Sequence, residues 1–184
     1  MLVPYAMRIA LALGRGLPQG PLGFFGEARL PMRVWPTDVD FYLHANNGSY
    51  LTLMDAGRYQ LALRTGLARV MLKRNCWPVL GGAIVRFRRE LRLLERFELC
   101  SRLLGWRGKW FFIEQRFEND GVVHASAIHK AVMRRKGRSV PFEEIARACG
   151  CSVTSPPLPH LAAWQEVLAS KERLAGHSPD EEAG

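Results

Sequence analysis

The sequence lacks the features that would place it in several common classes of protein. It contains no run of about 18 uncharged apolar residues, so we expect no transmembrane helix. Its four cysteines show neither CxxC spacing nor paired histidine ligands, which disfavours a metal site and a disulfide framework. We therefore expect no metal, and a reducing, cytoplasmic location. The four residues are Cys76, Cys100, Cys149 and Cys151.

Acidic residues are also scarce compared with basic ones. Seventeen Asp and Glu oppose 26 Lys and Arg, a formal net charge of +9 at pH 7. No helix-turn-helix, zinc-finger or RRM signature accompanies the basic groups at 86–92 and 134–138, so we expect no nucleic-acid partner. Two interpretations remain open. Either these residues are solvated strand faces, or side chains such as Arg86 and Arg88 hold the phosphates of coenzyme A by charge-assisted hydrogen bonds.

Length and composition indicate one main domain. A chain of 184 residues with 48% apolar residues can bury a substantial core. We expect an apolar docking segment at 1–25, a main domain at 26–150, and a linker with an amphipathic helix at 151–184. Pro4 and Arg8 interrupt the first segment, which favours a docking helix or a weak contact with a membrane surface over a signal peptide.

The remaining pattern combines one long helix with several strands. A strand at 30–35 is closed by Pro36, and a helix is predicted over 49–65, with Gly66 at the position of a C-cap glycine. Strands are predicted at 79–94, 97–106, 110–118 and 122–135, joined by hairpin turns, and a short helix at 142–148. The fold class is therefore α+β, with a curved antiparallel sheet wrapped around the long helix.

One polar segment, residues 38–50, lies between the first strand and the long helix. Asp38, Asp40, His44, Asn46 and Asn47 fall within ten residues. Each has an ordinary structural explanation, since Asp can fix a turn, Asn can cap a helix and His is often a hydrogen-bonded structural residue. Their conjunction before a helix points to chemistry, because free N–H groups at a helix N-terminus stabilise a developing oxyanion.

This segment, Asp-x-Asp-x-x-x-His-x-Asn-Asn-x-x-Tyr, resembles the active-site segment of hotdog-fold thioesterases. It is similar to the 4-hydroxybenzoyl-CoA thioesterase group and to plant acyl-ACP thioesterases. A closer resemblance, covering about residues 30–150, is to thioesterase-superfamily member six and its bacterial relatives. That resemblance implies a hotdog fold. It is carried further by the stretches 86–91, 93–98, 103–106, 110–117 and 137–141.

The resemblance also implies roles for individual residues. Asp40 would be the catalytic carboxylate, acting as nucleophile or general base, and His44 and Asn46 would orient it or a water molecule. The plant enzymes carry an Asn two residues after this acid, where this sequence has Tyr42. Backbone N–H groups of residues 46–48 would hold the oxyanion. The expected substrate-binding residues are Asn47, Gly48, Tyr50, Met54, Arg86 and Arg88.

We thus expect an acyl-CoA thioesterase that needs no cofactor, acts on a fatty or aryl thioester and assembles as a dimer or larger, with the acyl tunnel between subunits. An acyl-ACP substrate, or a non-catalytic acyl-CoA or lipid-binding hotdog protein, is the alternative. Hotdog hydratases with the motif Asp-x-Asn-Pro-x-His place the acid five residues before the His. Here the separations are six from Asp38 and four from Asp40, which argues against a hydratase.

Overall fold

The computed structural model describes residues 9–10, 13–14, 17–152 and 154–158. Residues 1–8, 11–12 and 15–16 of the expected docking segment, and most of the expected linker and amphipathic helix at 151–184, therefore lie outside the described residues. In the part of the chain that the structure describes, no helix is long and apolar enough to cross a membrane.

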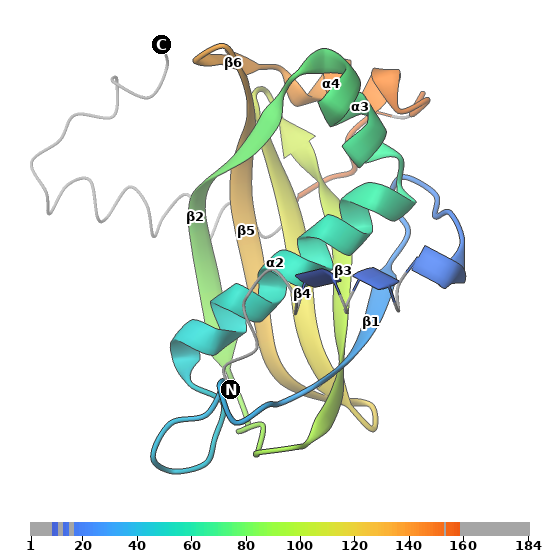
Figure 1. Cartoon of the computed structure of the whole chain (residues 1–184). Helices are drawn as coiled ribbons and strands as arrows, with labels where there is room; N and C mark the ends of the chain where they lie inside the picture. The colour runs from blue at the N-terminus through green and yellow to red at the C-terminus, as the bar shows by residue number, and fades with distance from the viewer. Residues whose placement is uncertain (1–8, 11–12, 15–16, 153, 159–184) are drawn as a thin grey trace, which may run out of the picture.

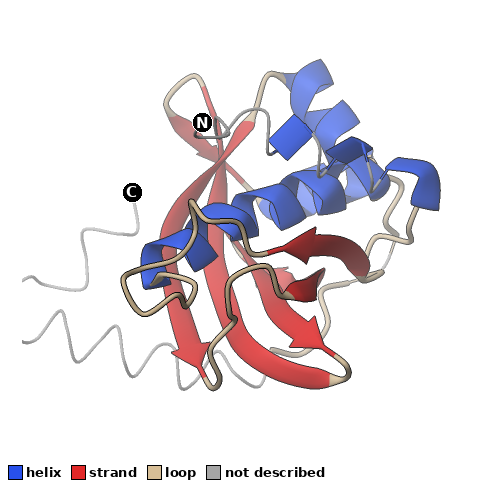
Figure 2. Cartoon of the chain, turned by 60° about the horizontal axis from the view of Figure 1, so that its bottom comes forward, coloured by secondary structure: helices blue, strands red, loops and turns tan. Residues whose placement is uncertain are grey.

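The described chain is an antiparallel sheet with its main helix lying across one face (Figure 1). The strand order is β1-β3-β4-β5-β2, and the short β6 pairs with the far end of β5. Seen from the end of the sheet, the long strands curve around the helix (Figure 2), which confirms the α+β hotdog arrangement. The elements are η1 (Leu17–Gln19), β1 (Ala28–Arg33), α2 (Asn47–Arg64), α3 (Leu67–Arg74), β2 (Trp77–Phe87), β3 (Arg96–Arg107), β4 (Trp110–Asn119), β5 (Val122–Arg135), β6 (Arg138–Val140) and α4 (Phe142–Ala148).

The long helix begins and ends close to the predicted positions. Asn46 caps it, with its side-chain Oδ1 accepting a hydrogen bond from Gly48 N at 2.8 Å. Thr65 ends it, and Gly66 follows in the left-handed region at φ 78°. A second helix, α3, starts immediately afterwards and was not predicted, because its eight residues form a pattern too short to separate from a loop.

The strand predicted at 79–94 ends earlier, at Phe87. Beyond Phe87 the chain crosses the end of the sheet, where the N–H groups of Arg88 and Arg89 both donate to His124 O. Leu91 is then fully buried, and its carbonyl accepts from Ala45 N at 2.8 Å. The loop at 88–95 therefore lies against the polar loop that precedes α2.

The core forms two clusters along α2. One lies around α3, α4 and the adjoining ends of the strands, and includes Phe111, Met133 and Phe142. The other lies around the first half of α2 and includes Leu53 and Phe117. Helix α2 packs against β1 and β3, whereas β2 forms the opposite edge of the sheet.

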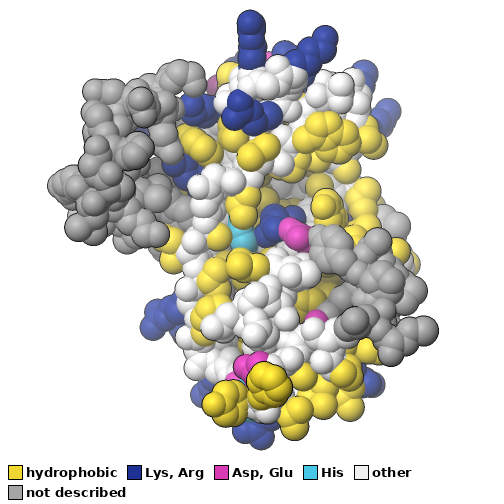
Figure 3. Space-filling model, turned by 60° about the vertical axis from the view of Figure 1, so that its left-hand side comes forward, with side chains coloured by type: hydrophobic (Ala, Val, Ile, Leu, Met, Phe, Trp, Pro, Cys, Tyr) yellow, Lys and Arg dark blue, Asp and Glu magenta, His cyan; other side chains and the backbone are white. Residues whose placement is uncertain are grey.

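Strand β2 is an unusual edge strand because its apolar side chains are largely exposed. The exposed positions on it are Trp77, Val79, Leu80, Ile84 and Phe87. Figure 3 shows apolar side chains gathered on this side of the molecule, with charged and His side chains among them. A long apolar edge of this kind offers unpaired backbone groups to another strand.

Candidate active site

The polar loop predicted from the sequence is a tight, internally bonded turn. Asp40 N donates to His44 O at 3.0 Å, and Leu43 N donates to Asp40 O at 3.1 Å. Leu43 adopts a positive φ of 60°, which lets the chain reverse within four residues. The tip carries Phe41, Tyr42 and Leu43, and all three side chains are exposed.

The two acids of the motif occupy different environments. Asp38 is buried, and its Oδ2 accepts a hydrogen bond from Trp35 N at 2.7 Å, so it fixes the turn that follows β1. Asp40 lies further along the loop, where one carboxylate oxygen accepts from Tyr42 N at 2.9 Å. This exposed hydrogen bond holds the Asp40 carboxylate in one orientation.

His44 and Asn46 point to partners other than Asp40. His44 Nε2 lies 3.7 Å from Glu90 Oε1. Hydrogen bonding to Arg92, and then the charge of His44, lower the pKa of Glu90. Within the described residues no hydrogen bond or ion pair joins the side chain of His44 to Asp40. The expected orienting role of His44 therefore remains a prediction.

The start of α2 uses some of the amides that the sequence suggested for an oxyanion. Gly48 N donates to the Asn46 side chain, and the amides of Ser49 and Tyr50 donate to Asn46 O at 2.9 and 3.3 Å. Asn46 is thus first of all a cap. The amide of Asn47, the first residue of the helix, is the donor that this arrangement leaves for the proposed oxyanion.

Tyr50 and Met54 are buried core residues of α2. The Tyr50 ring packs edge-on against Phe117 at 4.8 Å and against the half-exposed Phe87 of β2 at 5.2 Å. Burial raises the pKa of Tyr50. Arg86 is exposed near the end of β2, and Arg88 follows it, at the end of the sheet that carries the polar loop.

The structure also contains a polar cluster beneath α2 that sequence reasoning missed. The Arg58 guanidinium donates from Nη1 to Gln115 Oε1 at 3.0 Å and lies 3.3 Å from His129 Nε2. Its Nη2 forms an ion pair with Asp55, one helical turn away. Gln115 Nε2 in turn donates to Ser101 Oγ at 2.8 Å. Four elements, α2, β3, β4 and β5, contribute to this network.

His129 is neutral within this network. Burial, followed by the nearby charge of Arg58, lowers the pKa of His129 to about 3. A neutral imidazole can accept a hydrogen bond, which is the role that a guanidinium neighbour requires. The positive charge of Arg58 is therefore balanced by Asp55 and not shared with His129.

Gly57 allows α2 to approach the buried polar pair. A Cβ at this position would lie 2.5 Å from Ser101 Oγ and 2.6 Å from Gln115 Nε2. One signal in the sequence could have indicated the network. Ser101, Gln115 and His129 are buried polar residues on strands. Ser101 pairs directly with Gln115, and His129 lies two residues along β5 from Ala127, the partner of Gln115, so only the register of the sheet brings the three together.

The described residues contain no group of three or more His, Cys, Asp or Glu side chains that could hold a metal ion. The candidate site consists of the half-buried carboxylate of Asp40 on a fixed loop, a capped helix N-terminus and a buried polar network further along the same helix. Such a set can provide general-base or nucleophilic chemistry and oxyanion stabilisation.

Comparison with protein families matches residues 34–165 to the thioesterase-like superfamily. The chain belongs to this superfamily. Protein THEM6 of Xenopus laevis is 37% identical over 156 residues, which cover 80% of this chain and 75% of that protein. The family resemblance found in the sequence is thereby confirmed.

Solved structures of two other proteins share the fold. The probable thioesterase YbaW from Escherichia coli aligns with a TM-score of 0.61 and 22% identity, over 67% of this chain and 96% of that chain. A thioesterase from Thermus thermophilus, solved with coenzyme A and zinc, aligns with a TM-score of 0.60 and 21% identity, over 74% of this chain and 100% of that chain. These similarities confirm the sheet and helix arrangement.

Proposed function

We propose that the protein is an acyl-CoA thioesterase that uses Asp40 as its catalytic carboxylate. The observation that carries this proposal is the placement of Asp40, a carboxylate held by Tyr42 N on the loop that leads into the N-terminus of α2. Membership in the thioesterase-like superfamily supports the reaction class. Structural neighbours named as gentisyl-coenzyme A and 1,4-dihydroxy-2-naphthoyl-CoA thioesterases support a CoA thioester as the substrate.

In the general-base form of the mechanism, Asp40 takes a proton from water as the oxygen attacks the thioester carbonyl carbon. The amide of Asn47 donates to the oxyanion that forms, and one such donor contributes about 3 kcal/mol of transition-state stabilisation. Collapse of the intermediate breaks the C–S bond, and the proton on Asp40 passes to the leaving thiolate. In the nucleophilic form, the Asp40 carboxylate attacks the carbonyl carbon, the C–S bond breaks and the coenzyme A thiolate leaves. Water then hydrolyses the mixed anhydride, which releases the acid, regenerates the Asp40 carboxylate and supplies the proton that the thiolate takes up.

We also propose that two or more copies assemble through the β2 edge. The exposed apolar side chains of β2 support this, because pairing would bury them and satisfy the backbone groups of the edge. Phe41 at the loop tip is fully exposed and would add to such an interface. A cytoplasmic location, an acyl-ACP substrate and a weak membrane contact of residues 1–25 remain predictions from the sequence.

The decisive test compares wild type with Asp40→Asn. The Asn side chain keeps an oxygen that can accept from Tyr42 N, so the loop keeps its shape while the carboxylate is lost. Free-thiol release is measured on short, long and aromatic acyl-CoAs. We expect turnover by wild type and a loss of at least about 100-fold in the variant. Undiminished hydrolysis by a folded Asp40→Asn protein would reject the assignment.

The same assay separates the enzyme from its non-catalytic alternative. A binding protein would take up acyl-CoA saturably in equilibrium dialysis and release no thiol from any substrate of the panel. A carrier-protein substrate would show itself as turnover of acyl-ACP with none of the CoA thioesters. Either result would replace the acyl-CoA assignment.

A further inference from the structure

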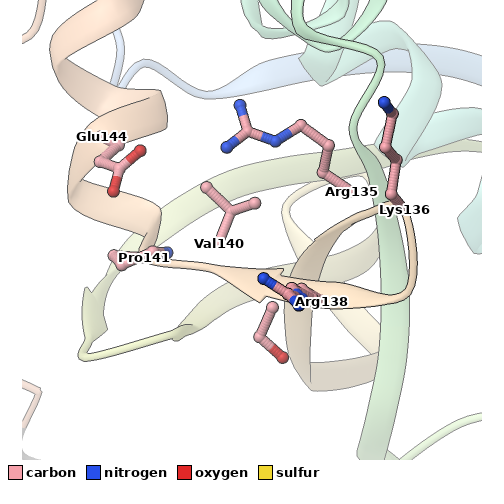
Figure 4. A pocket seen from close by; sticks show the side chains of 7 residues that line it. Arg135, Lys136, Arg138, Val140, Pro141 and Glu144 are labelled. Carbon is pink, nitrogen blue, oxygen red and sulfur yellow. The ribbon is translucent and has the colours of Figure 1, made fainter.

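A basic hollow lies at the end of the sheet opposite the polar loop. It has a volume of about 550 Å³ and is formed where the β5–β6 hairpin meets the start of α4 (Figure 4). Arg135, Lys136 and Arg138 contribute positive charge to its wall, and Glu144 contributes the one carboxylate among its lining residues. Val140 and Pro141 supply an apolar part.

These three cations differ from the Arg residues of the sheet that are paired with carboxylates. Arg29, Arg102 and Arg116 are each held in ion pairs with Glu side chains at 3.3 Å or less. Within the part of the chain that the structure describes, no ion pair involves Arg135, Lys136 or Arg138. With three cations and one carboxylate in its lining, the hollow carries a net positive charge in a concave place, which favours a ligand with negative charge.

The backbone of the hairpin holds the charges close together. Arg135 and Arg138 lie directly opposite each other in the β5–β6 register. Like charges at directly opposed positions destabilise an antiparallel pair, so this placement has a cost unless an anion lies between them. Lys136 and Gly137 form the turn with φ values of 49° and 81°, and the Arg134 guanidinium donates to Gly137 O. The wall is thus preorganised.

We propose that this hollow binds the phosphate groups in the nucleotide half of coenzyme A, with Arg135 and Arg138 as the main contacts. Guanidinium groups suit phosphate oxygens because they donate two parallel hydrogen bonds, and Val140 and Pro141 can pack against an uncharged part of the nucleotide. The inference rests on the proposed acyl-CoA thioesterase function and names the group by which that substrate is held.

The hollow lies too far from the Asp40 loop of its own chain to hold the nucleotide of a substrate bound there. Strand β2 pairs through Trp77 with Arg134 near the hollow, and through Phe87 with Ala125 near the polar loop. The two ends are about 33 Å apart at 3.3 Å per residue. Antiparallel pairing of two β2 edges would bring the hollow of one copy beside the Asp40 loop of the other. The hollow therefore serves the thioester site of a second copy.

Direct binding tests the hollow without any turnover. Adenosine 3′,5′-bisphosphate is titrated calorimetrically into wild type and into the double variant Arg135→Gln/Arg138→Gln, which keeps side-chain length and removes both charges. We expect about a tenfold weaker affinity in the double variant, since each exposed cation is worth up to about fivefold. Arg69→Ala, which removes an exposed cation on α3, is the matched control and should bind like wild type.

The Glu144→Gln substitution should change the affinity for the bisphosphate in the opposite direction. Removal of the carboxylate from the lining should tighten binding of the bisphosphate about twofold to fivefold, an effect that a purely structural role of Glu144 would not produce. Inorganic phosphate is titrated in parallel. Equal affinity for phosphate and for the bisphosphate would indicate a general anion site and overturn the nucleotide assignment. Equal binding by wild type and the double variant would overturn the site itself.

Kinetics then separates this inference from the thioesterase proposal. We expect the double variant to lose about tenfold in kcat/KM for acyl-CoA and to hydrolyse the matching acyl-pantetheine, which lacks the nucleotide, like wild type. If both substrates are hydrolysed and the double variant loses nothing on acyl-CoA, the hollow is not part of the site. If neither substrate is hydrolysed, the proposed function is wrong, and the calorimetric titration alone then decides whether the hollow binds the nucleotide phosphates.

Mixing two defective variants tests whether the hollow of one copy serves the Asp40 site of the other. Asp40→Asn has an intact hollow, and the double variant has an intact Asp40. After mixing and reassembly, we expect about a quarter of the wild-type kcat/KM on acyl-CoA, because half of the random dimers are mixed and each has one complete site. Activity no higher than the average of the two separate proteins would refute the arrangement between copies.

Discussion

Acidification provides a sensitive test of the polar network beneath α2. The folded protein keeps His129 neutral down to a pKa of about 3, whereas an exposed histidine in the unfolded chain titrates near 6.5. Between these two values the unfolded state binds more protons than the folded state. The free energy of unfolding must therefore decrease as the pH falls from 7.

The size of this effect can be calculated for the pH range from 7 to 5, which lies above the range in which carboxylates are protonated. Between pH 7 and pH 5 a single group with these two pKa values removes about 2 kcal/mol from the free energy of unfolding. Glu90 and Glu118 have pKa values lowered below 4.5, so their contributions are lost mainly below this window. The loss between pH 7 and pH 5 thus reports chiefly on buried histidine.

Urea denaturation at pH 7, 6 and 5, followed by tryptophan fluorescence, measures this loss. The comparison variant is His129→Gln, whose side-chain oxygen can accept a hydrogen bond from Arg58 but does not titrate. We expect the variant to lose about 2 kcal/mol less than wild type between pH 7 and pH 5. Equal losses in the two proteins would show that His129 is not held neutral by burial beside Arg58.

Three further predictions concern packing, capping and thiol chemistry. Gly57→Ala places a Cβ within 2.6 Å of Ser101 Oγ and Gln115 Nε2, and should lower the calorimetric Tm, because overpacking of about 1–3 kcal/mol exceeds a helix-propensity gain of about 1 kcal/mol. Asn46→Ala should lose about 1 kcal/mol in urea denaturation, and Asn46→Ser should restore most of it. Burial raises the pKa of Cys100 to about 12, so Cys100→Ser should leave the number of thiols that react rapidly with Ellman's reagent at pH 8 unchanged in the native protein.

Local signals in the sequence were enough to predict most of the fold. The turns at 107–109 and 119–121 are hairpin turns in the structure, with Gly108 and Gly121 at positive φ, because few other residues adopt that backbone conformation readily. The helix was found because its apolar residues recur with a helical period and Gly66 ends it. The predicted helix at 142–148 coincides with α4.

Features that depend on contacts between distant segments were not predicted. Leu91 and Leu93 continue the alternation of a strand, yet the chain leaves the sheet at Phe87, because its next backbone partners are His124 and the loop at 43–45. The polar network beneath α2 was not predicted either, because its members come from segments that are distant in the sequence. The loop that carries Asp40 was identified from its motif, but the actual partner of His44, Glu90, comes from the separate loop at 88–95.

Burial in the core explains only part of the apolar pattern of α2. Leu53 and Leu61 are buried against the sheet, as a helical period predicts, but Leu51, Tyr59 and Leu63 are exposed on the remaining surface of the same helix. Apolar side chains are also exposed along β2, at the edge of the sheet that α2 does not cover. In a single copy both sets stay exposed to solvent, whereas the proposed assembly through the β2 edge would bury apolar side chains of β2 and bring the exposed side of α2 toward a second copy. The exposed residues of α2 and β2 therefore support the same proposed interface. Between them on α2, the half-buried ion pair of Arg58 and Asp55 connects the surface of the helix with the polar network beneath it.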